Sequence, residues 1–463
     1  MAAKIIFLVV SAFSSTISLE QNAKLLVVSF DGLPVRFMNE TTTPNLWKFA
    51  QKGAWFEHGT QPQYIVHSWP NHMSLSTGLH QNSHHIIGDF FHNFKTGQTF
   101  DNRQLTDRRK YYEESLESHW YNGEPVWLTN QRAGNGRLTG CMFWPMAEAK
   151  VSGSFPGKLK ANRKEPKGKI GRLEETKKRF NELLRWFNSD REPINFGMFY
   201  NSLIEQKDTL LEVDEIMAQV DELVGHMTSA IAENGLADQL NVIILSDRGI
   251  SDVIKDDPKA RDICNFIDCK EINVNVDSIF PRYRNLTNMT EIYENLKRIN
   301  NESELLDLNV YWKPDFPKHY QYANLDLVGD IILTGVYPHW FNLPQVGYLL
   351  HHSSPAPSFV PEVQEQRGIL MMQGPAFEAG VVVKANDVQN IDIYPLMCKV
   401  LGIEPAPNNG SLSRVGAVIR VVEERSTATI LIVFGCVALA LLFCCMAYCI
   451  IWRFRKRSGY DNI

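Results

Sequence analysis

Two aspartates stand directly after apolar runs of the sequence, and both are candidate functional groups. Asp31 follows KLLVVSF in a Phe-Asp-Gly tripeptide, and Asp247 follows NVIILS in the tetrapeptide SDRG. Polar groups at the carboxyl ends of parallel strands gather at one edge of a sheet, where α/β proteins place their sites. A strand-end aspartate is also often a turn former or a helix cap. The matching position of the two residues favours a shared acidic site.

The elements that would position these aspartates are short β-branched runs alternating with helical patterns. The apolar runs are KLLVVSF, INFGMFY, NVIILS and GILMMQG. Between the second and third, apolar residues recur at helical spacing from Leu211 to Ile231 and end at Asn234-Gly235, which predicts an amphipathic helix with a C-cap. Such alternation predicts an α/β fold with a mainly parallel sheet and helices on both faces. The Lys-, Gly- and Pro-rich segment 153–171 is predicted to be an exposed loop.

The two ends of the chain predict a secreted, membrane-anchored topology. Residues 1–18 combine Lys4, an apolar run and small residues, which is typical of a signal peptide. Residues 427–452 are almost wholly apolar and are followed by RFRKR, which predicts a transmembrane helix with a cytoplasmic tail at 453–463. Residues 413–426 are then a juxtamembrane stalk, and the chain is a single-pass type I protein of the cell surface.

Charge and surface motifs fit an extracellular domain. The net charge of −5 provides no strong field for a nucleic acid polymer as partner. Cys264 and Cys269 lie in a short polar loop and can close on each other, whereas Cys141 and Cys398 lie in apolar stretches and fit buried thiols. Five N-x-S/T triplets predict glycosylation, at Asn39, Asn285, Asn288, Asn301 and Asn409.

Several stretches resemble, in order and spacing, motifs of the ectonucleotide pyrophosphatase/phosphodiesterase family. Its catalytic domain opens with stretches like LLVVSFDGLPVRF, TTTPNLWKFAQKG and HSWPNHMSLSTGLHQNSHHIIGDFF. Later matches are WYNGEPVW, INFGMFY, LSDRG, RGILMMQGPAF and NIDIYPLMCKVLGIEPAPNNGS, so the resemblance covers residues 24–412. It implies an alkaline-phosphatase-like fold in which two zinc ions and a hydroxyl nucleophile hydrolyse phosphodiesters or pyrophosphates outside the cell. The shorter family members, which this chain resembles, are type I membrane proteins.

The resemblance assigns the first part of the site residue by residue. Asp31 matches the first metal-binding aspartate, and Ser68 stands where the family has a nucleophilic threonine. A serine is chemically competent in that role. The asparagine that helps to hold the phosphoryl oxygen in the family is replaced by Asp89, whose carboxylate would repel an anionic phosphate.

The remaining metal positions are altered. The E-P-D-x-x-G-H motif of the family aligns with residues 202–208 of this chain, which puts Ile204 at the aspartate and Asp208 at the histidine. A shift by one residue would offer Glu205 in place of Ile204 and Thr209 in place of Asp208. Either alignment removes ligands from one zinc ion, which needs about four.

The last two positions of the metal site also differ from the family. Its Asp-His-Gly motif appears as Asp247-Arg248-Gly249, and a guanidinium cannot coordinate zinc but can pair with Asp31 and Asp247. His351 and His352 are the nearest candidates for the last histidine ligand, and they are equally well explained as surface residues, because the turn that precedes this ligand in the family is missing.

These substitutions predict a pseudoenzyme: a cell-surface protein that keeps the phosphodiesterase fold as a binding or structural module for an unknown extracellular ligand or protein. We expect it to bind fewer than two zinc ions, or none. The alternative is an active metal-dependent phosphodiesterase that hydrolyses nucleotides or phospholipid-type phosphodiesters, with Ser68 as nucleophile and one metal held by Asp31, Asp247 and a histidine.

Overall fold

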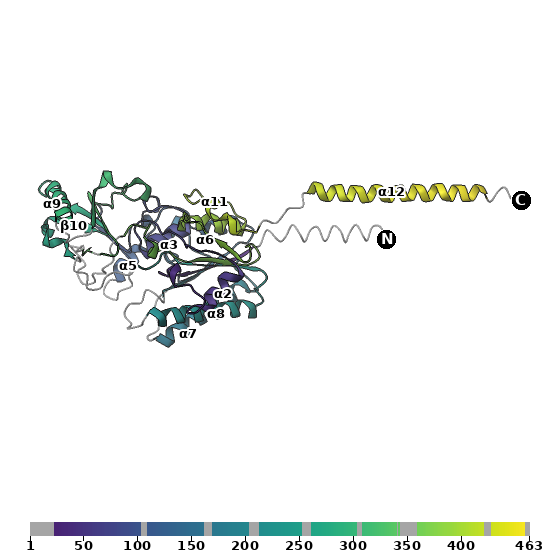
Figure 1. Ribbon diagram of the computed structural model, residues 1–463, viewed down its shortest axis with the longest axis horizontal. Helices are drawn as coiled ribbons and strands as arrows, with labels where there is room; N and C mark the ends of the chain where they lie inside the picture. Colours follow the sequence, from purple (N-terminus) through teal and green to yellow (C-terminus); the bar gives the residue numbers. More distant parts are fainter. Residues whose placement is uncertain are drawn as a thin grey trace. The chain divides into compact units, whose positions relative to one another are not determined.

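The computed structural model describes residues 23–102, 109–161, 169–202, 213–251, 261–302, 308–339, 341–342, 359–420 and 427–458 (Figure 1). The chain divides into two units, Met1–Ile419 and Arg420–Ile463. The first unit contains the candidate site. Of the sequence predictions, the signal peptide at 1–18, Ile204, Asp208, His351 and His352 lie outside the described residues.

An eight-stranded sheet runs through the first unit in the order β16-β2-β15-β8-β1-β7-β5-β6. In that order the strands are Val381–Val383, Ala54–Phe56, Leu370–Gln373, Leu240–Leu245, Lys24–Phe30, Phe196–Asn201, Thr139–Met142 and Lys158–Lys160. The four apolar runs seen in the sequence form β1, β7, β8 and β15, which lie next to one another in the sheet.

The sheet is mixed, with parallel pairing between most of its neighbouring strands, as predicted, and antiparallel pairing at β15. Strands β8, β1, β7, β5 and β6 are mutually parallel, but β15 runs antiparallel to both β8 and β2. The run GILMMQG shows only that a strand is apolar on both faces. Its direction depends on the path of the preceding chain, which a short apolar run does not record.

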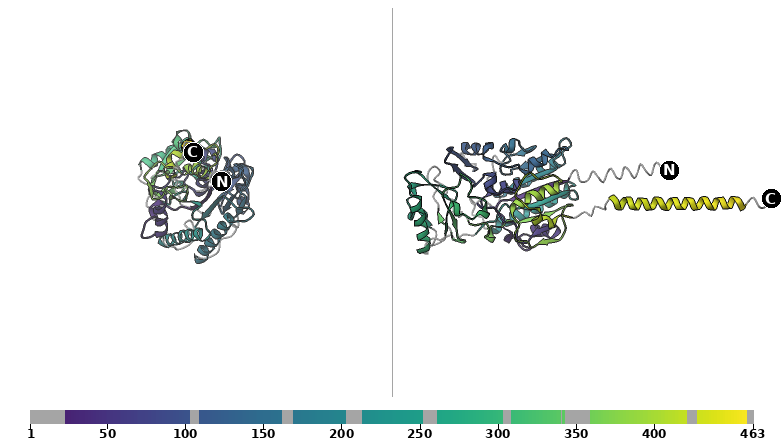
Figure 2. Two further views of the ribbon diagram at one scale, coloured as in Figure 1. Left: turned by 90° about the vertical axis from the view of Figure 1, so that its right-hand side faces the viewer. Right: turned by 90° about the horizontal axis from the view of Figure 1, so that it is seen from above.

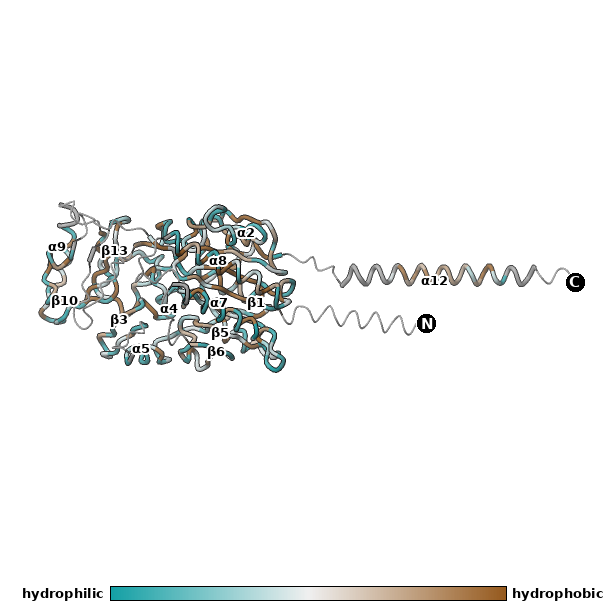
Figure 3. Tube along the Cα trace, turned by 90° about the horizontal axis from the view of Figure 1, so that it is seen from below, coloured by the Kyte–Doolittle hydropathy of each residue, from teal (hydrophilic) through white to brown (hydrophobic). Residues whose placement is uncertain are grey.

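Helices cover both faces of the sheet, as predicted (Figure 1). One face packs against α2 (Pro44–Lys52), α7 (Lys169–Phe187) and α8 (Val213–Glu233), and the other against α3 (Ser68–Thr77), α6 (Val126–Arg132) and α10 (Ile393–Leu401). Strand β1 shows the division, because Leu25 and Val27 join one core while Leu26 and Val28 join the other. Hydrophobic stretches, brown in Figure 3, run through the strands between these helices.

Several local predictions can be compared with the structure. The predicted amphipathic helix is α8, and Gly235 follows it with a φ of 68°, as a C-cap glycine does. Cys264 and Cys269 form a disulfide, and Cys141 and Cys398 are buried thiols. The predicted loop 153–171 is wrong in part, because β6 and the start of α7 lie within it. Strand β6 is the outermost of the sheet, and an edge strand needs little apolar sequence.

A second, antiparallel sheet has the order β10-β11-β13-β12. Its strands are Ile272–Asn275, Ser278–Pro281, Ile331–Gly335 and Leu308–Trp312, and α9 (Met289–Glu302) packs against it with its own apolar cluster. The teal-to-green segment that carries this sheet lies at one end of the first unit in Figure 2. The remaining described α-helices and strands of the first unit are α4 (Gln81–His84), α5 (Arg109–Ser115), α11 (Leu412–Val415), β3 (Phe90–Asn93), β4 (Gln98–Asp101), β9 (Arg261–Asp262) and β14 (Phe341–Asn342).

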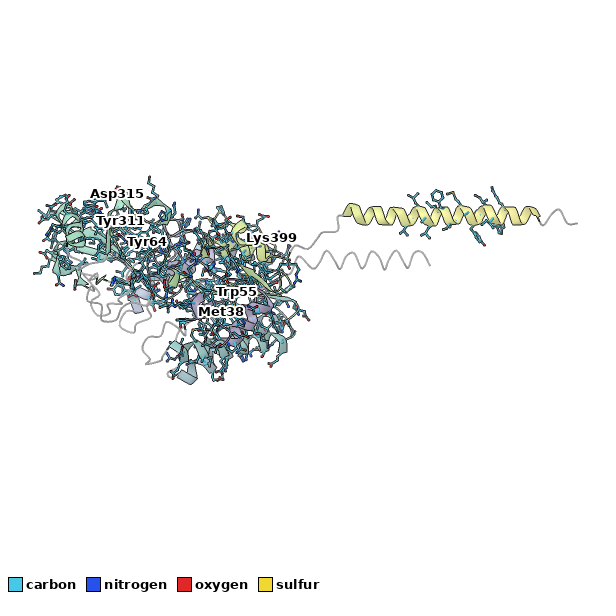
Figure 4. All side chains as sticks on the ribbon, viewed as in Figure 1. Met38, Trp55, Tyr64, Tyr311, Asp315 and Lys399 are labelled. Atoms are coloured by element: carbon cyan, nitrogen blue, oxygen red, sulfur yellow. A yellow bond between two sulfur atoms is a disulfide. The ribbon has the colours of Figure 1, made fainter. Side chains whose placement is uncertain are left out.

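A buried carboxylate joins the second sheet to the segment that leads into α3. Asp277, in the β10–β11 turn, is 1% exposed and accepts hydrogen bonds from the hydroxyls of Tyr64 and Tyr322. Tyr64 and Tyr311, labelled in Figure 4, both pack on Phe316. Burial raises the pKa of Asp277 to about 7, although the two hydroxyls oppose the shift.

Residues 427–458 form one helix, α12 (Thr427–Ser458). The predicted transmembrane helix over 427–452 is wrong: within the part of the chain that the structure describes, no helix combines the length and the apolarity that crossing a membrane requires.

We expect the raised pKa of Asp277 to make stability fall as pH rises. The folded pKa of about 7 lies above the value of about 4 for an unfolded aspartate, so its contribution is complete below pH 4 and is lost toward pH 7. The free energy of unfolding should fall by up to about 1 kcal/mol for each pH unit in this window. Urea denaturation at several pH values measures this slope.

Asp277→Asn should remove the contribution of Asp277 to that slope, because the amide does not titrate, so the slope of the variant should be shallower than the parent's by up to about 1 kcal/mol for each pH unit. The exposed Asp315, labelled in Figure 4, provides a matched control, and Asp315→Asn should keep the slope of the parent. An Asp277→Asn chain with the parent's slope would contradict the assignment.

Candidate functional site

Asp31 and Asp247 lie side by side at the carboxyl ends of β1 and β8. These strands are parallel neighbours whose register pairs Ser29 with Leu245, so two more residues along each chain bring the aspartates to the same edge. Both residues are 0% exposed. The structure therefore brings together the two acids that the strand-end pattern selected.

The turn after β1 holds the two strand ends together. Gly32 has a φ of 66° and its amide donates to Asp247 Oδ1 at 3.1 Å, while the amide of Leu33 donates to Ser246 Oγ at 2.8 Å. A Cβ on Gly32 would lie 2.9 Å from Arg248 Nη1. Glycine is thus favoured by the left-handed backbone, and its lack of a side chain allows the close approach of the arginine.

The guanidinium of Arg248 lies between the two carboxylates. Its Nη2 is 3.2 Å from Asp31 Oδ1, and its Nε is 3.5 Å from Asp247 Oδ2. The Arg248 side chain is 14% exposed. This is the arrangement that the Asp-Arg-Gly motif predicted, with one cation set against two buried anions.

Burial and the neighbouring carboxylate of Asp31 both raise the pKa of Asp247. Its pKa is raised to about 6, mainly by burial and then by the charge of Asp31. His72, Arg248 and the amide of Gly32 oppose the shift. Arg248 therefore compensates only part of the cost of burying two acids together.

Two further side chains complete the site, and the sequence analysis did not single out either. The hydroxyl of Tyr200, at the end of β7, donates to Asp31 Oδ2 at 2.6 Å. The His72 ring is fully buried, with Nδ1 2.8 Å from the Ser68 carbonyl oxygen and 3.7 Å from Asp247 Oδ2, and with Nε2 2.9 Å from Ser29 Oγ.

The positions of Tyr200 and His72 in the sequence could have identified both as site residues. Tyr200 is paired with Ser29 in the parallel register, so the strand-end rule that selected Asp31 also applies to β7. His72 lies four residues after Ser68 on α3, and residues at this spacing share one face of a helix.

Ser68 and Asp89 meet at the start of α3. Ser68 is the first residue of the helix, is 2% exposed, and its Oγ has no hydrogen-bond partner among the described residues. Asp89 Oδ1 accepts a hydrogen bond of 2.8 Å from the amide of Trp69. His67 directly precedes Ser68, and burial lowers the pKa of its ring. The charge of Asp89 opposes this shift, whereas the charge of Arg248 adds to it.

The described residues do not fit the zinc pair that the resemblance implied. Zinc takes about four nitrogen, oxygen or sulfur ligands, and no group of three or more His, Cys, Asp or Glu among these residues is arranged to hold a metal ion. The position between Asp31 and Asp247 is taken by a guanidinium, which has no lone pair to donate.

Comparison with known proteins identifies the group to which these motifs belong. Residues 25–343 match the family described as type I phosphodiesterase / nucleotide pyrophosphatase. A mouse bis(5'-adenosyl)-triphosphatase is 28% identical over 413 residues, with 84% of this chain and 80% of the mouse protein covered. The rat ectonucleotide pyrophosphatase/phosphodiesterase family member 7 is 28% identical over 420 residues, with 84% and 86% covered.

Solved structures show the same fold. Mouse ectonucleotide pyrophosphatase/phosphodiesterase 5, an inactive variant in complex with AMP, superposes with a TM-score of 0.71 at 23% identity and covers 86% of this chain and 100% of its own. The human form gives a TM-score of 0.70 at 23% identity with the same coverage. The alkaline-phosphatase-like α/β fold that the resemblance implied is therefore confirmed.

We expect Arg248→Ala to destabilise the chain strongly near neutral pH. The change leaves two buried carboxylates without their shared cation, and removing one partner of a buried ion pair typically costs about 3–5 kcal/mol. Arg132, which pairs with Glu124 at the surface, gives a control, and Arg132→Ala should have little effect. Thermal and urea unfolding measure both variants, and an Arg248→Ala chain that unfolds like the parent would contradict the interpretation.

Arg248→His should make stability depend on zinc. The imidazole would add a third ligand beside Asp31 and Asp247, and ligands that bind only the folded state raise its stability. The melting temperature of this variant should rise with added zinc and fall again with chelator, while that of the parent should not respond. An Arg248→His chain that ignores zinc would show that the two carboxylates are not placed to hold a metal.

Proposed function

Because this chain belongs to the type I phosphodiesterase / nucleotide pyrophosphatase family, we propose that it is an extracellular member whose catalytic site has become a fixed structural and binding centre. The single observation that carries this proposal is the guanidinium of Arg248 between Asp31 and Asp247. The molecule would then act as a module for an extracellular ligand or protein, using the phosphodiesterase fold without the phosphodiesterase chemistry.

A guanidinium can replace the positive charge of a zinc ion but not its coordination of ligands. Zinc in such sites lowers the pKa of an attacking hydroxyl and stabilises a leaving oxygen by direct coordination. A guanidinium supplies positive charge and directed hydrogen bonds, but it cannot coordinate a nucleophile. Arg248 also forms ion pairs with Asp31 and Asp247 in the absence of any ligand, so these two acids already balance its charge.

One observation favours a second candidate function, a residual phosphodiesterase. The buried Ser68 hydroxyl has no hydrogen-bond partner among the described residues and stands at the amino-terminal end of a helix, where nucleophiles of this kind gain from the helix dipole. The mouse relative is named a bis(5'-adenosyl)-triphosphatase, so dinucleoside polyphosphates are the first substrates to examine.

Features of the surface support an extracellular location. Asn39, Asn285, Asn288 and Asn409 are exposed, which is the condition for glycosylation, while the side chain of the fifth candidate, Asn301, lies outside the described residues. The Cys264–Cys269 disulfide is typical of an oxidising compartment.

Zinc content and hydrolysis distinguish the two candidate functions. We expect the purified chain to retain fewer than two zinc ions after dialysis, as measured by elemental analysis, and to hydrolyse nitrophenyl nucleotide and phosphocholine esters and diadenosine triphosphate at background rates. Turnover that Ser68→Ala abolishes would favour the residual phosphodiesterase, whereas turnover that Ser68→Ala leaves unchanged would come from a contaminant. Two tightly held zinc ions would contradict the proposed loss of the metal site.

Glycosylation gives an independent test of the location. The chain expressed in secretory cells should lose apparent mass on treatment with an N-glycosidase, and combined Asn→Gln changes at all five triplets should remove that shift. No mass shift in the parent would argue against passage through the secretory pathway.

A further inference from the structure

The amino-terminal end of α3 offers few backbone donors, and one of them is already bound. Pro70 has no N–H, and the amide of Asn71 donates to the His67 carbonyl oxygen at 3.3 Å. The amides of Ser68 and Trp69 therefore remain to carry the positive end of the helix dipole. The Trp69 amide donates to Asp89 Oδ1 at 2.8 Å, so a carboxylate lies where the helix would attract an anion.

Asp89 belongs to a different structural element, which fixes its position independently of α3. It directly precedes β3 (Phe90–Asn93), and its carbonyl oxygen accepts a hydrogen bond of 3.1 Å from the amide of Asn102, just beyond β4. The preceding Gly88 is tightly enclosed, because a Cβ there would lie 2.8 Å from Val276 Cγ2. The β3–β4 hairpin thus fixes the position of the Asp89 carboxylate beside the start of α3.

A second observation indicates that this end of the helix is suited to an acceptor. The Ser68 hydroxyl is buried and has no partner among the described residues, and the same is true of His67 Nδ1. Buried polar atoms normally find a partner, so the Ser68 hydroxyl is a donor that remains available to an acceptor. Asp89 accepts a hydrogen bond from the Trp69 amide but none from the Ser68 hydroxyl.

We propose that Asp89 is an internal anion that occupies the amino-terminal end of α3 and excludes phosphate and phosphate esters from the space beside Ser68. A second negative charge cannot approach the same donors without strong repulsion from the Asp89 carboxylate. The inference deepens the proposed function and rests on the same site: Arg248 takes the place of a cation, and Asp89 takes the place of the anion that would bind next to it.

The test compares phosphate binding by the parent and Asp89→Asn. The amide keeps an oxygen for the Trp69 amide, adds two N–H donors and removes the negative charge, so it changes the local electrostatics with little change in shape. Inorganic phosphate is titrated into the chelator-treated full chain at low salt, followed by calorimetry and by phosphorus NMR. We expect the affinity of Asp89→Asn for phosphate to exceed that of the parent by about tenfold or more, and the gain to shrink at high salt.

Further variants test whether the gain in phosphate affinity arises at the start of α3. Asp268 accepts a hydrogen bond from the amide of Lys270 at a short helical turn elsewhere, so Asp268→Asn removes the same charge from a similar contact and should not increase phosphate binding. Adding Ser68→Ala to Asp89→Asn should reduce the gained affinity, because the serine hydroxyl would donate to the bound phosphate. Asp89→Ala, which removes the carboxylate without adding donors, gives the same comparison if the amide variant does not fold.

Equal phosphate affinity in the parent and Asp89→Asn would overturn the inference, as would a gain that the Ser68→Ala change leaves intact. Because the titration is made with chelator present, the outcome does not depend on whether Arg248 excludes zinc. Failure here would leave the zinc and hydrolysis results unaffected. Hydrolysis by the parent in the presence of zinc would overturn the proposed function without changing the chelated comparison.

Discussion

The ion pairing of two buried carboxylates with one arginine is the interaction on which the rest of the site depends. The parallel register of β1 and β8 forces Asp31 and Asp247 into neighbouring positions, and neither is exposed to solvent. Two buried acids repel one another and lose hydration, so the fold needs a positive charge between them. Arg248 supplies it from the residue after Asp247, and the left-handed turn at Gly32 leaves the space that the guanidinium fills.

A covalently attached cation has different consequences from a metal ion. It is present at every zinc concentration and cannot be exchanged, so the strand ends are held together as soon as the chain folds. Its N–H donors also point in fixed directions, and it offers no open coordination position for a substrate or an activated hydroxyl. At the start of α3 the Asp89 carboxylate has the complementary effect, because it accepts the Trp69 amide and places a negative charge at the positive end of the helix. The two side chains thus place a fixed positive charge at the strand ends and a fixed negative charge at the start of α3.

Local patterns in the sequence were sufficient for much of the fold. The runs that became β1, β7 and β8 are short and apolar, and α8 repeats its apolar residues at helical spacing, so the apolar pattern of each segment indicated its type. The direction of β15, the edge strand β6 and the antiparallel sheet around Asp277 were not predicted. These depend on which distant segments meet, and the contact of Asp277 with Tyr64 joins residues that no local pattern relates. The apolar stretch at 427–452 led to a membrane span that the described helices do not support.

The sequence by itself determined the family, the strand-end position of Asp31 and Asp247, and the replacement of an imidazole by the guanidinium of Arg248, because each of these is a matter of residue type at a fixed spacing. Only the tertiary structure decided how the groups pair. The Tyr200 hydroxyl on Asp31, the His72 ring on Ser29, and the Asp89 carboxylate on the Trp69 amide each join elements that are separate along the chain. Hydrogen bonds and ion pairs act over a few ångströms in space, and that proximity comes from the packing of the strands and helices, which residue spacing alone does not contain.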